Sequence, residues 1–103
     1  MHSYDAQMLV LTALASGPLH GYAVNTEIEK LTGSRLGPGS LYGALARLEA
    51  RGLIEPVPDR ADARDRQRIV RITAAGRETL RAELEQMARV AQAGLRALGV
   101  APS

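Results

Sequence analysis

The stretch from Leu36 to Gly52, LGPGSLYGALARLEARG, decides the fold of this chain. Its leucines Leu41, Leu45 and Leu48 recur at helical spacing, which predicts a helix with one face toward an apolar core. Gly52 follows the last of them and is the residue type that most often ends a helix. The stretch therefore predicts one amphipathic helix with a defined end.

Two starting points fit this helix. Ser40 can act as the N-cap through its hydroxyl, or Pro38 can occupy the first turn, where its missing N–H is not needed. The predicted outer stripe carries Ser40, Ala44, Arg47 and Arg51. Small residues followed by arginines are suited to a helix that enters a DNA major groove, although an ordinary amphipathic helix with a solvated basic face gives the same pattern.

Composition limits the classes of protein to consider. A chain of 103 residues supports one domain with a modest core, and the absence of cysteine excludes a disulfide scaffold and a thiolate metal site. No catalytic triad, glycine-rich phosphate loop or metal-ligand spacing occurs, so we expect neither an enzyme nor a cofactor. Without an apolar run of membrane-spanning length or a secretion signal, the expected location is the cytoplasm.

Positive charge is concentrated in the middle of the chain. The net charge is only +2, but residues 35–77 carry nine arginines against five acidic residues, a local balance of +4. Such a basic segment is typical of proteins that bind a polyanion.

The remaining elements follow from apolar spacing and turn residues. We predict a first helix that is capped by Asp5 and runs to about Ser16, and a second helix at 21–32. Strands are predicted at 53–57 and 67–72, and a last helix, capped by Thr73, at 74–98. In the second helix we expect Leu31 to face inward and Asn25 to face out. The fold class is mostly α with a small β-hairpin: a winged helix–turn–helix (1–73) followed by a long C-terminal dimerisation helix (74–103), forming one compact unit.

Three motifs in this order resemble the PadR family of transcriptional regulators. They are LTALASGPLHGY at 11–22, PGSLY at 38–42 and ITAAG at 72–76. Two features depart from the family pattern: Gly43 replaces the usual proline after Tyr42, and Ile69 and Val70 replace the usual pair of aromatic residues in the wing. The wing segment 62–66 is more similar to that of MarR regulators. The resemblance implies a homodimeric repressor that leaves a palindromic operator when a small-molecule effector binds near the dimer interface. A MarR-like regulator and a winged-helix module that binds protein rather than DNA are the alternatives.

Candidate DNA contacts lie on three elements. They are Tyr22 at the start of the second helix; Ser40, Tyr42, Arg47 and Arg51 on the central helix; and Arg60, Arg64, Arg66 and Arg68 on the wing. The structural alternatives are a packed tyrosine, a helix cap for Ser40, and surface ion pairs for the wing arginines.

A heptad-like stripe marks the last helix as the candidate dimerisation element. Its members are Leu80, Leu84, Met87, Ala91, Leu95 and Leu98. A chain of this size offers little to cover the far half of so long a helix, so a partner subunit is the expected cover.

Overall fold

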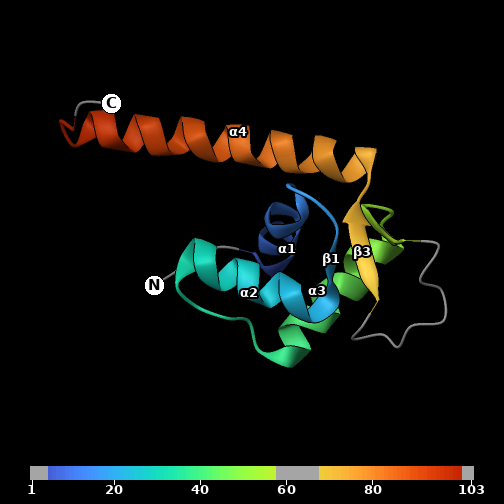
Figure 1. The fold of residues 1–103 in the computed structure, drawn as a ribbon. Coiled ribbons are helices and arrows are strands. Elements are labelled where there is room, and N and C mark those ends of the chain that lie inside the picture. The colour runs from blue at the N-terminus through green and yellow to red at the C-terminus, as the bar shows by residue number, and fades with distance from the viewer. Residues whose placement is uncertain (1–4, 58–67, 101–103) are drawn as a thin grey trace.

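The computed structural model describes residues 5–57 and 68–100. It contains four helices and three short strands in these described ranges (Figure 1). In chain order they are α1 Ala6–Leu14, β1 Leu19–His20, α2 Gly21–Thr32, α3 Pro38–Ala50, β2 Ile54–Pro56, β3 Ile69–Ile72 and α4 Ala74–Ala97. The predicted class, a winged helix–turn–helix with a long terminal helix, is confirmed.

Helix α1 occupies the centre of the molecule. Its start is capped as predicted, because the Asp5 carboxylate accepts a hydrogen bond from the backbone N–H of Gln7 at 3.0 Å. Val10 and Leu14 on this helix are completely buried, and α1 contacts α2, α3, α4 and β3. The other elements are therefore arranged around one short apolar helix, which ends at Leu14, slightly earlier than the sequence predicts.

The sheet has a third strand that the sequence analysis missed. Besides the predicted pair β2–β3, residues Leu19 and His20 form β1, which pairs antiparallel with β3 in the order β1-β3-β2. Leu19 lies opposite Val70 and His20 opposite Ile69. The sequence does not predict this two-residue strand because it is too short to show a period. It joins the start of α2 to the base of the wing.

The start of α3 follows the second of the two predicted possibilities. Pro38 is in the first turn with Gly37 as the N-cap, so Ser40 lies inside the helix and is not its cap. At the other end Arg51 is the C-cap, and Gly52 follows with a φ of 75°, a left-handed conformation that glycine adopts without strain.

A compact junction fixes α4 to the rest of the domain. The Thr73 hydroxyl accepts a bond from the N–H of Gly76 at 3.0 Å, as its predicted capping role requires, and donates to the carbonyl of Gly52 at 2.8 Å. Gly76 packs so tightly that a Cβ atom there would lie 2.1 Å from the carbonyl oxygen of Leu53. The ITAAG motif is thus the point where the first turn of α4 meets the residues that follow α3.

The two halves of α4 differ in their surroundings. Leu80, in the first half, belongs to the chain's own core at 5% exposure, so little of its surface remains for a partner. Every residue from 88 to 100 is exposed, and Figure 1 shows this end of α4 extending past the other helices. Leu84, Leu95 and Leu98 are all exposed, Leu98 at 80%. No helix in the described ranges is long and apolar enough to cross a membrane.

We predict that Gly76→Ala destabilises the fold. The added methyl group would meet backbone rather than a flexible side chain, so the cost should be at least that of overpacking a core, roughly 1–3 kcal/mol in the free energy of unfolding. Urea unfolding followed by circular dichroism measures it. Gly94→Ala is the control, because a Cβ there meets nothing within 4 Å and alanine favours a helix. Equal stability of the Gly76 variant and the parent would contradict the tight junction.

Candidate nucleic-acid interface

The outward face of α3 is formed by small residues. Gly39, Ala46 and Ala50 are exposed along this face, and Gly43 is partly exposed between them. The predicted stripe needs a correction here, because Ala44 is buried at 1% and faces the core with Leu41, Leu45 and Leu48. The true face is rotated away from Ala44, and the backbone of α3 can approach another surface closely along it.

Arg47 borders this face and remains available for an external contact. It is exposed, and no side chain or backbone group in the described ranges forms a hydrogen bond or ion pair with it. Its guanidinium group lies over Gly43, one turn earlier. Ser40 is on the same edge of the helix, also exposed, in the first turn.

Two other predicted arginines are held by neighbours inside the chain. Arg51 donates from Nη1 to the Gln7 side-chain oxygen at 2.5 Å, which ties the end of α3 to α1. Arg68 donates from Nη2 to a carboxylate oxygen of Glu49 at 3.2 Å, which links the wing to the recognition helix. Glu49 is therefore a partner of the wing. Both pairs are partly or fully exposed, so they orient side chains more than they stabilise the fold.

The tip of the wing lies outside the described residues. This applies to the predicted contacts Arg60, Arg64 and Arg66 and to the MarR-like segment 62–66. The base of the wing lies within the described residues. There the N–H of Val57 donates to the carbonyl oxygen of Ile69 at 2.8 Å, and the N–H of Gly21 donates to the carbonyl oxygen of Arg68 at 3.1 Å.

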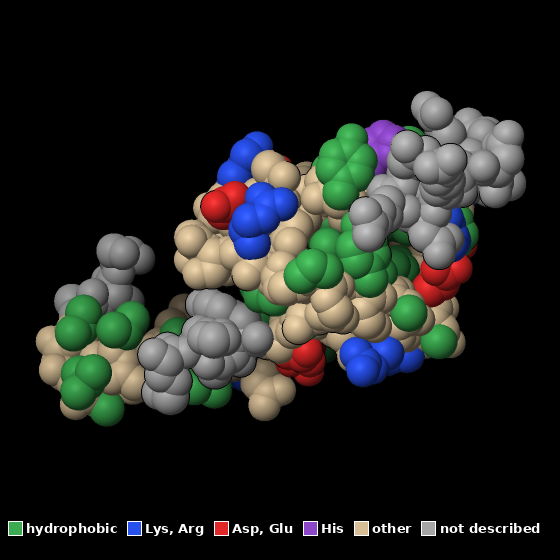
Figure 2. All heavy atoms as spheres, turned by 90° about the horizontal axis from the view of Figure 1, so that it is seen from below, with side chains coloured by type: hydrophobic (Ala, Val, Ile, Leu, Met, Phe, Trp, Pro, Cys, Tyr) green, Lys and Arg blue, Asp and Glu red, His purple; other side chains and the backbone are tan. Residues whose placement is uncertain are grey.

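Tyrosines from two helices line one shallow cleft of about 450 Å³ beside the start of α3. Tyr22 is 56% exposed and stacks on His20, with ring centroids 5.5 Å apart, whereas Tyr42 is partly buried against the core. Arg35, which the sequence analysis did not single out, lines the same cleft and is exposed. Figure 2 shows this side of the molecule, where charged side chains lie around a largely uncharged surface.

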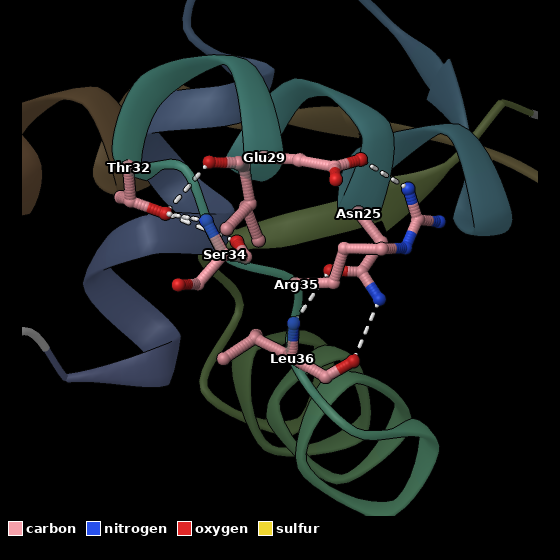
Figure 3. Close-up of polar contacts among 7 residues, drawn as sticks. Asn25, Glu29, Thr32, Ser34, Arg35 and Leu36 are labelled. Carbon is pink, nitrogen blue, oxygen red and sulfur yellow. Dashed lines mark hydrogen bonds and ion pairs between the residues drawn. The ribbon is translucent and has the colours of Figure 1, made fainter.

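The turn between α2 and α3 is held by a buried asparagine. Asn25 is 7% exposed; its Nδ2 donates to the carbonyl of Leu36 at 2.8 Å, and its Oδ1 accepts from the N–H of Leu36 at the same distance (Figure 3). The prediction that Asn25 faces out is wrong for this reason. A polar residue on the buried side of a helix is stable there only when its hydrogen bonds are satisfied, and the backbone of Leu36 satisfies them.

The rest of this turn is also hydrogen-bonded within itself. Gly33 ends α2 with a φ of 83°, the N–H of Ser34 donates to the Thr32 hydroxyl at 3.2 Å, and Arg35 donates to a Glu29 carboxylate oxygen at 2.9 Å (Figure 3). Leu31, expected to face inward, is instead 52% exposed beside the turn. The path of the turn thus fixes where α3 begins relative to α2.

The described residues contain no group of three or more histidine, aspartate or glutamate side chains arranged to hold a metal ion. Every buried side-chain nitrogen or oxygen atom among them has a hydrogen-bond partner.

Comparison with known families shows the class of regulator to which the chain belongs. Residues 10–82 match the model of the transcriptional regulator PadR-like family, a range that runs from the second half of α1 to the first turns of α4. The chain belongs to the PadR-like family of transcriptional regulators. The resemblance seen in three sequence motifs is therefore confirmed, and α2 and α3 are the helix–turn–helix of a PadR-like chain.

Individual relatives agree with this assignment. The PadR-like chain is 59% identical over 90 residues to an uncharacterized 37.1 kDa protein in transposon TN4556 of Streptomyces fradiae, covering 87% of this chain but only 25% of that protein. It thus spans about a quarter of that relative's length. It is 40% identical over 83 residues to the transcriptional regulator Rv3488 of Mycobacterium tuberculosis, covering 78% of this chain and 76% of the relative.

A solved structure shows the same fold. The PadR-like transcriptional regulator BC4206 of Bacillus cereus superposes with a TM-score of 0.73 at 22% identity, covering 89% of each chain. At that identity the likeness concerns the fold and not individual contacts.

We predict that Asn25→Asp destabilises the domain. A carboxylate still accepts from the N–H of Leu36, but it cannot donate to the Leu36 carbonyl, which is then buried without its partner. The free energy of unfolding should fall by about 1–3 kcal/mol. Chemical denaturation measures the loss, with Thr26→Ala at an exposed neighbouring position as the control. If both variants unfold at the same denaturant concentration, Asn25 does not hold the turn.

Proposed function

We propose that this chain is a dimeric DNA-binding repressor that inserts α3 into the major groove of a palindromic operator. One observation carries the proposal: the exposed face of α3 has small residues along its length, and at its edge lies Arg47, whose charge no described residue neutralises. Small residues permit close approach to base edges, and an arginine can bind guanine O6 and N7 together.

The surroundings of α3 support contacts to the DNA backbone. The Tyr22 hydroxyl and the exposed Ser40 hydroxyl can donate to phosphate oxygens on either side of the groove. Arg68 at the base of the wing lies on the far side of α3 from Arg47, next to Glu49. The proposed wing contacts by Arg64 and Arg66 rest on the sequence alone.

The exposed half of α4 supports the proposal of a homodimer. Leu84, Met87, Ala91, Leu95 and Leu98 share one side of this helix, and residues beyond Ala91 contact little of their own domain. A second copy offers the same stripe, so each buried leucine would contribute about 1.5–3 kcal/mol twice. Two recognition helices related by this symmetry would read two half-sites.

Release by a small molecule is the regulatory part of the proposal. Shallow, open depressions of about 770 and 560 Å³ lie along the two sides of α4, with Leu80 and Leu84 lining one and Met8 and Met87 lining the other. A dimer partner that packs on α4 would enclose them and turn them into sites for a small molecule. A ligand held there could change the spacing of the two recognition helices.

The competing function is a winged-helix module that binds protein. A gel-shift with the DNA upstream of the chain's own coding sequence separates the two. A repressor binds it with a strong salt dependence, and a protein-binding module does not bind it at low protein concentration.

Arg47→Ala should relax base preference. Loss of a bidentate guanine contact should cost roughly 1–3 kcal/mol per half-site and remove the preference at one base pair in each. Arg51→Ala is the comparison, since Arg51 is tied to Gln7 at the end of α3 and should change affinity little and equally for all sequences. A binding-selection experiment on both variants and the parent measures this. An unchanged selected motif for Arg47→Ala would mean that Arg47 contacts only phosphate.

Leu95→Glu combined with Leu98→Glu should yield monomers. Both side chains are exposed on the projecting half of α4, so the change should leave the fold of each chain intact. Light scattering measures the mass, and circular dichroism checks the fold. Gln92→Glu with Ala93→Glu is the matched control, because it adds the same charge on other faces of the helix. A stable dimer in the leucine variant would place the interface elsewhere.

A further inference from the structure

The Arg47 guanidinium has an unusual resting place. Its Nη1 atom lies 3.2 Å from the position that a Cβ atom of residue 43 would occupy, and its central carbon lies 4.0 Å from that point. The side chain therefore folds back by one helical turn and covers the backbone of Gly43. In a helix, side chains lean toward the N-terminus, so an arginine at position 47 reaches position 43 without strain.

This placement depends on the small size of residue 43. A separation of 3.2 Å is tighter than nine in ten real Cβ contacts, so a methyl group at residue 43 would move the guanidinium outward by a few tenths of an ångström. A larger residue would exclude it from this position altogether. Glycine in a helix interior lowers stability, and nothing else in the surroundings of Gly43 requires it: its φ is not positive, and no other atom comes within 4 Å of the added Cβ.

The other arginines near the interface are positioned differently. Arg51 is held by Gln7 and Arg68 by Glu49, each through a side-chain hydrogen bond. Arg47 lacks such a partner among the described residues, so the space at Gly43 sets where its charge lies.

We propose that Gly43 is a specificity-determining residue that positions Arg47 for base reading. This inference rests on the proposed DNA-binding function. With glycine at 43, the guanidinium lies on the outward face of α3, toward the N-terminal half, which enters deepest into a major groove. A side chain at 43 displaces the guanidinium from this face, slightly for alanine and as far as the flank of the helix for a large residue, where phosphates rather than guanine edges are in reach. Gly43 thus sets the choice between base contact and backbone contact.

A double-mutant cycle tests this positioning. Gly43→Ala, Arg47→Ala and the double variant are compared with the parent for binding to the selected operator and to an operator changed at the base pair that Arg47 reads. Gly43→Ala should reduce discrimination between the two sites about two- to fivefold, because the guanidinium is displaced from the bidentate geometry in each half-site. In the Arg47→Ala background the same change should have no effect on discrimination.

The double-mutant cycle and a control variant distinguish this positioning role from a purely steric effect of the added methyl group. A methyl group on the outward face could simply hold α3 away from the groove; then Gly43→Ala would weaken binding equally with and without Arg47, and the proposal would be wrong. Gly39→Ala adds a methyl to the same face one turn earlier, with nothing within 4 Å, and should leave discrimination unchanged. The melting temperature of Gly43→Ala should rise, which excludes unfolding as the cause. Lack of sequence-specific binding by the parent itself would instead refute the proposed function.

Discussion

Burial of α1 is the constraint on which the rest of the structure depends. A chain of this length has a single core, and Val10 and Leu14 at its centre are removed from solvent only because α2, α3, α4 and β3 all contact this helix. Each such side chain contributes about 1.5–3 kcal/mol when fully buried. Once these elements are packed on α1, the face of α3 that remains outside is decided: it is the side opposite Leu41, Leu45 and Leu48. The proposed reading surface is thus a direct consequence of core packing.

Hydrogen bonds then fix the recognition helix against its neighbours. Asn25 ties the turn before α3 to α2, and the Thr73 hydroxyl connects the residue after α3 to the start of α4. Glu49 and Arg68 connect the helix to the wing. Preorganisation of this kind lowers the entropy lost when a helix and a wing bind one duplex together. Of the two charged side chains within α3, Arg47 lies outside this network, and the open space over Gly43 accommodates its guanidinium group.

The long terminal helix divides into a half that belongs to the fold and a half that supports the proposed assembly. Gly76 and Leu80 pack its first turns onto the domain, and the stripe from Leu84 to Leu98 continues the same helical face into solvent. One continuous helix therefore joins the core to the proposed dimer interface. A change in the packing of the distal half would be transmitted to the recognition helices as a rigid-body movement, which is a physical basis for regulation by a ligand bound beside α4.

The sequence by itself determined the helices, the caps at Asp5 and Thr73 and the order of a winged helix–turn–helix, because local propensity and apolar period act over a few neighbouring residues. The family followed from the resemblance of three motifs to those of known regulators. The sequence also placed Arg47 on the exposed side of α3. Only the tertiary structure decided the third strand β1, the burial of Ala44 and the inward position of Asn25. A period assigns a residue to a broad stripe and cannot resolve its edges, which is where Ala44 lies. Asn25 and β1 depend on partners at Leu36 and in β3, distant in sequence, and those partners are defined only when the chain has packed around α1.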